Sequence, residues 1–162
     1  MDALAIFGIS VVSSFAGSAA AAKLYVWPWL RSRDRYKGLA SLVAPHMFLR
    51  FIGLSFLVPG VVSSALPRAF AAPAAYGDFV AGILAIFATI ALAKNVSWAI
   101  GAVWVFNIWG AADLLFGFYE GPHAGIHPEM LGAAFYLVTA IVPPLLVTHL
   151  LIFGLLPRTK AS

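Results

Sequence analysis

Residues 98–119 read WAIGAVWVFNIWGAADLLFGFY, a continuous apolar run with one charged side chain, Asp113. An α-helix needs about 20 predominantly apolar residues to cross the hydrocarbon core of a bilayer, so this run predicts a transmembrane helix. Four similar stretches accompany it: Ala3–Trp29, Leu39–Ala65, Asp78–Ala93 and Met130–Leu156. The sequence therefore predicts an all-α, polytopic integral membrane bundle of five transmembrane helices, with residues 1–162 forming a single transmembrane domain.

The composition of the whole chain agrees with a membrane protein. Of its 162 residues, 62% are hydrophobic and 10% are charged, whereas soluble domains average about 25% charged residues. Five spans leave no length for a soluble catalytic domain, so any function must lie among the helices or in their short loops. The chain has no cysteine, which excludes disulfides and thiolate metal sites. The expected partner is the lipid bilayer, and no nucleic acid is expected.

The basic residues are distributed unevenly among the loops. Most lie in residues 23–37, at Lys94 and in residues 158–160, whereas the two other loops carry only Arg68 together with acidic residues. With five alternating helices, the positive-inside rule places the N-terminus outside and the C-terminus in the cytoplasm. The expected location is the bacterial inner membrane. The first residues lack the positive charge of a signal peptide, so the first helix is expected to remain uncleaved.

Prolines predict one loop and one kink. Pro67 and Pro73 bracket an alanine-rich segment, residues 66–77, which is predicted to be an outer loop along the membrane interface. Pro143 and Pro144 fall in the middle of the fifth stretch. Because two backbone donors are missing there and the rings clash with the preceding turn, the fifth helix is predicted to kink.

Polar residues inside the spans provide the main functional signal, because each is costly in lipid and needs a partner. From the rise per residue, Arg50 and Asp113 lie at depths that differ by about 6 Å, so an ion pair is predicted. Asn107 is predicted to accept a further hydrogen bond from the same guanidinium. The pair either links two helices or anchors a ligand, and Trp109 and Glu120 are then further ligand-binding candidates.

Two histidines form a second candidate site. His46 and His149 belong to different helices and lie at the same estimated depth, about 10 Å from the cytoplasmic end. Two imidazoles from neighbouring helices can ligate a haem iron, so a bis-histidine haem site is one hypothesis. The alternative is that each histidine bonds a backbone carbonyl.

A third candidate site lies in the loop before the fifth stretch. Histidines and carboxylates are ligands of zinc and other divalent metals, and this loop supplies Glu120, His123, His127 and Glu129. Asp78 is a further candidate ligand. The alternative is an ordinary polar turn, with Glu129 beside the positive end of the fifth helix.

No sequence motif indicates an enzyme. The chain contains no GxGxxG, Walker, HExxH or GxSxG pattern, so nucleotide chemistry, metalloproteolysis and serine hydrolysis have no visible machinery. The leading hypothesis is binding or transport of a small anionic, lipid-soluble or amphipathic molecule at Arg50, Asn107 and Asp113. A haem-containing redox protein and a non-catalytic accessory subunit of a larger membrane complex are the alternatives, and homo-oligomerisation remains open.

Overall fold

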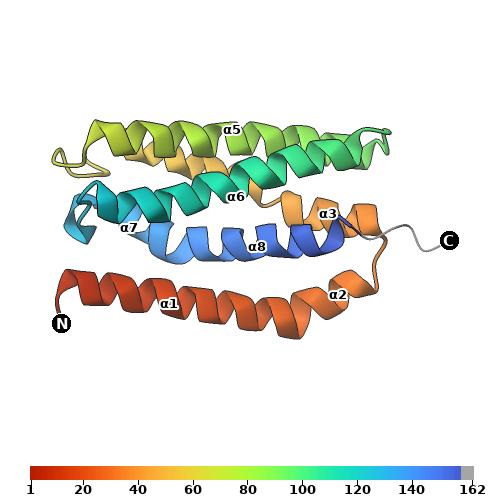
Figure 1. Ribbon diagram of the computed structural model, residues 1–162, viewed down its shortest axis with the longest axis horizontal. Helices are drawn as coiled ribbons and strands as arrows, with labels where there is room; N and C mark the ends of the chain where they lie inside the picture. Colours follow the sequence, from red (N-terminus) through yellow and green to blue (C-terminus); the bar gives the residue numbers. More distant parts are fainter. Residues whose placement is uncertain (158–162) are drawn as a thin grey trace.

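The computed structural model describes residues 1–157, and every regular element in that range is helical. Five helical segments are long and apolar enough to cross a membrane: Ala3–Arg31, Arg35–Leu57, Arg68–Ala93, Ala99–His123 and Ala134–Leu155. They run side by side along the long axis of the molecule (Figure 1). The prediction of an all-α chain with five membrane-length helices is confirmed.

Several of these segments are composite. The first contains α1 (Ala3–Ala21), a π-helical turn η1 (Ala22–Val26) and α2 (Trp27–Arg31). The second contains α3 (Arg35–Val43), α4 (His46–Leu49) and a 3₁₀ helix η2 (Arg50–Leu57). The third and fourth are single helices, α5 (Arg68–Ala93) and α6 (Ala99–His123). After a short 3₁₀ turn η3 (Pro128–Met130), the fifth contains α7 (Ala134–Tyr136), a π-helical turn η4 (Leu137–Ile141) and α8 (Val142–Leu155).

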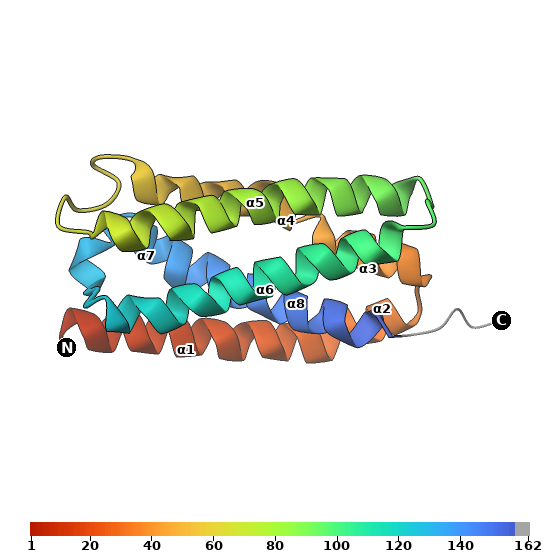
Figure 2. The ribbon, with the colours of Figure 1, turned by 45° about the horizontal axis from the view of Figure 1, so that its top comes forward.

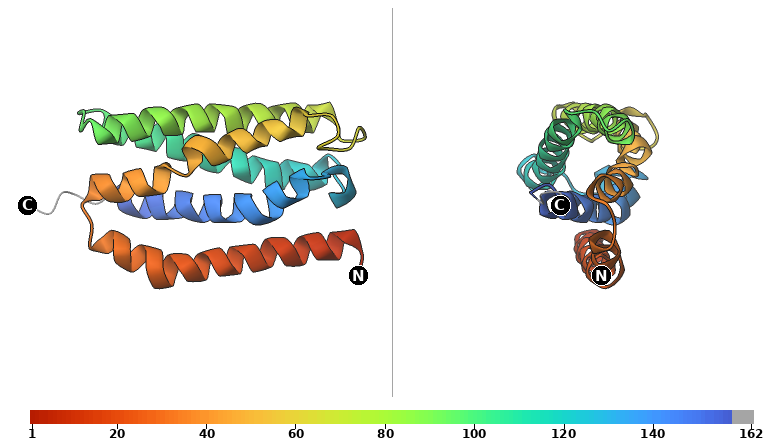
Figure 3. Two further views of the ribbon diagram at one scale, coloured as in Figure 1. Left: turned by 180° about the vertical axis from the view of Figure 1, so that it is seen from behind. Right: turned by 90° about the vertical axis from the view of Figure 1, so that its right-hand side faces the viewer.

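The second to fifth segments enclose a common centre, and the first lies outside them. Seen end-on, four segments form a ring, with the red-to-orange first segment beside it (Figure 3). α5 packs between η2 and α6, whereas α1 contacts α8 and η4. No residue of α1 is buried. The buried polar side chains of the described chain therefore all belong to the second to fifth segments.

The two ends of the bundle differ. We call the end with Met1 and the connections 58–67 and 124–133 the N-terminal end, and the opposite end the C-terminal end (Figures 1 and 2). The two connections at the N-terminal end are tied together, because the Ala133 amide donates to the Val61 carbonyl at 2.8 Å and the Ser63 amide to the Met130 carbonyl at 3.0 Å. The C-terminal half is filled by a continuous apolar cluster around Leu39, Ala88, Val103 and Ile152.

The buried face of α5 consists of small residues. Ala75, Ala81, Ala85 and Ala88 are fully buried, and with Asp78 between the first two they follow one another at steps of three or four residues, which is the spacing of one helix face. Small side chains let neighbouring helices approach closely in a membrane bundle. Asp78 lies on this same face, between Ala75 and Ala81.

The third helix begins well before the predicted start at residue 78. Residues 66–77 were predicted to form an outer loop, but α5 begins at Arg68, directly after Pro67. Pro73 lies inside the helix, where it removes one backbone donor. The alanines on either side favour the helix, and Phe70 and Ala75 are buried in the bundle. The burial of this segment outweighs the single lost hydrogen bond.

Two other boundaries also shift. The second segment ends at Leu57 rather than at residue 65, because Pro59 and the positive-φ residue Gly60 belong to the irregular connection that follows. In the fifth segment, Pro143 and Pro144 occupy the first turn of α8, and the irregularity lies just before them in the π-helical turn η4. Prolines are tolerated in a first helical turn because those backbone donors lack intrahelical partners.

Candidate functional site

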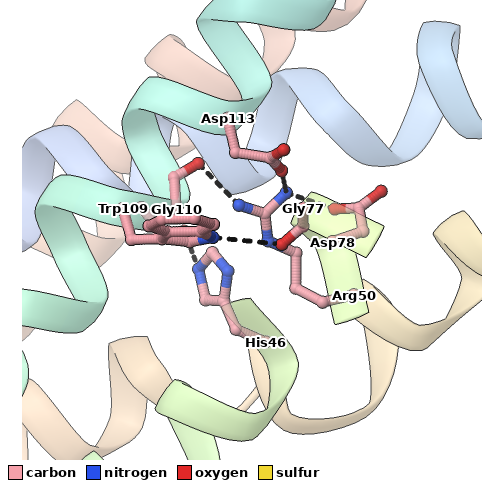
Figure 4. Close-up of polar contacts among 8 residues, drawn as sticks. His46, Arg50, Gly77, Asp78, Trp109, Gly110 and Asp113 are labelled. Carbon is pink, nitrogen blue, oxygen red and sulfur yellow. Dashed lines mark hydrogen bonds and ion pairs between the residues drawn. The ribbon is translucent and has the colours of Figure 1, made fainter. Parts of the chain in front are cut away.

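The centre of the bundle contains a buried arginine paired with two carboxylates. Arg50, the first residue of η2, is completely buried. Its Nη1 atom pairs with Asp78 of α5 and lies 3.2 Å from Oδ2 of Asp113 of α6. Its Nη2 atom donates to the Gly110 carbonyl at 2.5 Å (Figure 4). The predicted pairing of Arg50 with Asp113 is confirmed, and Asp78 joins it as a second carboxylate.

The 3₁₀ geometry of η2 explains how Arg50 faces the centre. A 3₁₀ helix has three residues per turn, so every third side chain points the same way. The buried residues of η2 follow this period: Arg50, Gly53 and Phe56. One line of side chains therefore supplies the guanidinium, a glycine beside α5 and an aromatic ring towards the N-terminal end.

Three glycines make room for the charged groups. A Cβ atom on Gly53 would fall on the Asp78 carboxylate, and one on Gly77 would fall on the Asp113 carboxylate. At Gly110 a Cβ atom would lie 2.6 Å from Cε1 of His149 and 3.0 Å from Nη2 of Arg50. Such distances are too short for non-bonded heavy atoms. We call Arg50, Asp78 and Asp113 the ion centre. It depends on close contact among η2, α5, α6 and α8.

Trp109 adds a hydrogen bond to the contact between α5 and α6. Its indole Nε1 donates to the Gly77 carbonyl at 3.2 Å, which joins α6 to α5 beside the ion centre (Figure 4). The indole is nearly half exposed on the outside of the bundle. Trp109, predicted as a ligand-binding residue, therefore lies next to the ion centre on the outer side of the bundle, where its hydrogen bond joins α6 to α5.

A second buried polar group lies beside the ion centre. Nδ2 of Asn107 donates to the His149 carbonyl at 3.2 Å, and Oδ1 of Asn107 bonds Nδ1 of His149 at 2.7 Å. Nε2 of His46 bonds Oγ1 of Thr148 at 2.8 Å. We call these four residues, Asn107, His149, His46 and Thr148, the histidine cluster. The predicted bond from Arg50 to Asn107 is wrong, because Oδ1 of Asn107 bonds His149 and the terminal nitrogens of Arg50 bond Asp78, Asp113 and the Gly110 carbonyl.

The two histidines meet, but they do not leave space for a haem between them. The ring centroids of His46 and His149 are 4.5 Å apart and the rings are tilted by 55°. Rings in such contact leave no room for a macrocycle. The Asn107 amide nitrogen donates to a carbonyl, so its oxygen accepts from Nδ1–H of His149. Nε2 of His149 and Nδ1 of His46 are buried without a hydrogen-bond partner in the described chain.

The predicted metal ligands are not brought together. Within residues 1–157, no three His, Asp or Glu side chains are grouped closely enough to hold a metal ion. His123 ends α6, where its Nδ1 donates to the Tyr119 carbonyl at 2.6 Å and its ring stacks on Tyr119. Asp78 is engaged by Arg50. The four predicted ligands are spread along the chain: Glu120 and His123 lie in the last turn of α6, His127 precedes η3, and Glu129 lies within η3.

A cavity of about 330 Å³ extends from the N-terminal end to the ion centre. Its walls come from α1, η2, α5, α6, the connection that follows α6, η4 and α8, and they are mostly apolar. The carboxylates of Asp78 and Asp113 line it, whereas Arg50, Asn107 and Glu120 do not. His127 lies at the wall formed by the connection. Of the predicted ligand-binding residues, only Asp113 faces this cavity.

Asp78 could have been found from the sequence by its spacing. It follows Ala71 and Ala75 and precedes Ala81 and Ala85, at the spacing of a helix face. A carboxylate on a stripe of small residues faces a neighbouring helix, where it needs a cationic partner. The flanking prolines concealed this pattern, because they suggested that the helix had not yet begun.

Fold and site together define a class: a small all-α protein with five membrane-length helices and a charged centre at the base of an apolar cavity. Residues 6–157 match a family described as Domain of unknown function (DUF8737), and the chain belongs to that family. The matched region contains the ion centre and nearly all of the cavity wall. No curated protein and no solved structure matches the chain.

Proposed function

We propose that this protein binds a small amphipathic molecule in the cavity at the N-terminal end of the bundle. The observation that carries the proposal is that an apolar cavity ends on two carboxylates, Asp78 and Asp113. Small-molecule sites are concave, largely apolar and equipped with a few polar groups that orient the ligand, with volumes of about 300–1,000 Å³. The cavity has these properties.

A purely structural ion pair explains less of this arrangement. One carboxylate would neutralise Arg50, yet two converge on it. Protein interiors are close-packed and contain few voids larger than a water molecule. A link between helices needs neither a second carboxylate nor a cavity beside it. A ligand site accounts for both features.

Binding is better supported than conduction along a fixed path. The cavity reaches Asp78 and Asp113, and beyond them the C-terminal half is filled by the apolar cluster that includes Leu39, Val103 and Ile152. Transport would therefore require the helices of the C-terminal half to separate. We infer a protein that captures its ligand from the side of the N-terminal end.

The charge distribution supports an orientation for the proposed site. Arg31, Arg33 and Lys37 lie at or near the connection between α2 and α3, and Lys94 follows α5 at the same C-terminal end. The positive-inside rule assigns this end to the cytoplasm. In our proposal the protein lies in the bacterial inner membrane with its N-terminal end outside, so the ligand enters from the outer leaflet or the outer aqueous phase.

A cavity-filling variant tests the proposal. Gly117 lines the cavity, and a Cβ atom there would meet nothing within 4 Å. We expect Gly117→Leu to fill the cavity and to abolish binding of the uncharged fluorescent dye N-phenyl-naphthylamine to the protein in phosphatidylcholine nanodiscs. Dye fluorescence is measured as the excess over empty nanodiscs.

The matched control is Gly101→Leu on the same helix. Gly101 also has open space around it but does not line the cavity, so this variant should bind the dye as the unaltered protein does. Equal dye binding by all three proteins, or equal loss in both variants, would contradict a ligand in the cavity. An accessory subunit without a ligand would give the first of these results.

A further inference from the structure

We infer that the ligand's polar head is an organic cation, such as an alkylammonium group, held against Asp78 and Asp113. This inference rests on the proposed function, because it names the chemical class that the same cavity accepts. It differs from the expectation of an anionic ligand at Arg50. Four features of the described chain carry it: the engagement of Arg50, the excess of negative charge, the free carboxylate oxygens and the aromatic walls.

Arg50 does not serve as an anchor for an anion. It is completely buried and is absent from the cavity wall. Both terminal nitrogens are engaged, Nη1 by the two carboxylates and Nη2 by the Gly110 carbonyl. An anionic head would have to displace an existing partner and would approach the negative charges of Asp78 and Asp113.

The negative charge at the cavity floor exceeds the positive charge. Two carboxylates share one guanidinium, so the ionised group carries a formal charge of −1. Among residues 1–157, no lysine or arginine lines the cavity, and the titratable residues on its wall besides the two aspartates are limited to His127. The titratable side chains of His46 and His149 lie near Arg50 on the side away from the cavity wall. An uncompensated charge at membrane depth is costly, and a bound cation would remove the imbalance.

The carboxylates also retain free acceptor atoms. Asp78 uses Oδ1 on Arg50, and Asp113 uses Oδ2. Within residues 1–157, neither Oδ2 of Asp78 nor Oδ1 of Asp113 has an ion-pair or hydrogen-bond partner, although both side chains line the cavity. Carboxylate oxygens only accept hydrogen bonds. The groups that complement them are N–H donors and cations.

The walls suit the rest of such a molecule. Four phenylalanines line the cavity: Phe7, Phe56, Phe70 and Phe118. Aromatic faces attract ammonium groups through the quadrupole of the ring, and they also provide apolar surface for an alkyl chain. Charge complementarity at the floor and aromatic walls above it therefore indicate an amphiphile with a positively charged head.

A probe series of constant chain length tests the inference on the unaltered protein. The probes are octyltrimethylammonium, octanol and octyl sulfate, each displacing N-phenyl-naphthylamine from the protein in phosphatidylcholine nanodiscs. The ammonium probe cannot lose its charge by deprotonation. We expect it to bind at least about tenfold more tightly than octanol because of its attraction to the unbalanced carboxylate. Octyl sulfate should bind more weakly than octanol.

Two variants test whether the preference for the ammonium probe over octanol arises at the carboxylates of the cavity. Asp113→Asn removes the excess negative charge while Asp78 still pairs with Arg50, so the advantage of the ammonium probe over octanol should disappear while octanol still binds. Glu120→Gln is the matched control, because it removes one negative charge from the same helix away from the cavity wall. It should leave the advantage unchanged. An equal loss in Glu120→Gln would reveal general surface attraction and overturn the inference.

The outcomes separate this inference from the proposed function. If octanol and octyltrimethylammonium bind equally well, or if octyl sulfate binds best, the cavity holds a ligand but the head is not a cation. If none of the probes displaces the dye and Gly117→Leu has no effect on it, the proposed function fails as well. The probe series needs no variant, so the test remains decisive even if Asp113→Asn does not fold.

Discussion

The ion centre and the histidine cluster are neighbouring polar groups in the same bundle, and they differ in what lies beside them. Arg50 and its two carboxylates form the floor of a cavity, whereas His46 and His149 are completely buried against apolar residues such as Phe106. In the histidine cluster the Asn107 amide is paired through both its nitrogen and its oxygen. In the ion centre each carboxylate keeps an oxygen free. Nε2 of His149 and Nδ1 of His46 also lack partners in the described chain, so neither burial nor incomplete pairing marks a functional site by itself; the cavity that adjoins the carboxylates does.

Among the variants that compare the ion centre with the histidine cluster, the one that removes the positive charge of Arg50 should destabilise the protein most. Replacing Arg50 by methionine leaves two buried carboxylates without their cation, and removing one partner of a buried ion pair costs about 3–5 kcal/mol. We expect the free energy of unfolding in detergent, monitored by circular dichroism, to fall by this amount. Arg33→Met is the control, since Arg33 is exposed and only overlies the Trp29 ring. A similar loss of unfolding free energy in both variants would show that the ion pairs of Arg50 do not stabilise the fold more than an exposed arginine does.

A methyl group at Gly110 should disturb both polar groups together. Its Cβ atom would lie 2.6 Å from His149 and 3.0 Å from Arg50, so α6 must shift or both side chains must move. Overpacking of this kind costs about 1–3 kcal/mol. The same unfolding measurement on Gly101→Ala, where nothing lies within 4 Å, should show a change within about 0.5 kcal/mol. If Gly110→Ala is as stable as Gly101→Ala, the close contact among η2, α6 and α8 is not required.

Removal of the Asn107 amide should affect the histidine cluster but not the ion centre, so that stability falls while ligand binding is unchanged. Asn107→Leu leaves Nδ1–H of His149 buried without its acceptor, which costs about 1–3 kcal/mol of folding free energy. Because Asn107 does not line the cavity, we expect dye binding to be unchanged in the protein that remains folded. Both quantities are measured on one preparation in nanodiscs. A loss of dye binding without a loss of stability would mean that the histidine cluster belongs to the ligand site.

The position of each polar residue along its helix could be predicted, but its partners only in part. Estimated depth was enough to pair His46 with His149, which lie at equal depth, and Arg50 with Asp113, because the long arginine side chain can bridge their difference of about 6 Å. Depth does not define rotation about the helix axis. For this reason Asn107 was expected to contact Arg50, although it faces His149.

The pairing of Asp78 with Arg50 was missed for a different reason, namely the predicted start of the third helix. Its partnership with Arg50 depends on α5 starting at Arg68, ten residues before the predicted start. Local proline content favoured a loop, and the packing of Phe70 and the alanine face against η2 and α6 outweighed it. Tertiary contacts often override local propensity in this way. The cavity could not be predicted at all, since it is formed by five separate parts of the chain.

The amino-acid sequence alone predicts five membrane-length helices, because each apolar run has the length at which a helix can cross a bilayer with its backbone groups satisfied internally. It also determined that Arg50 and Asp113 would need partners, because isolated charges at that depth are costly. The sharing of one arginine by two carboxylates, and the cavity that ends on them, arise from the packing of the helices. Those features depend on helix rotation and on glycine contacts at Gly53, Gly77 and Gly110, which no single helix specifies.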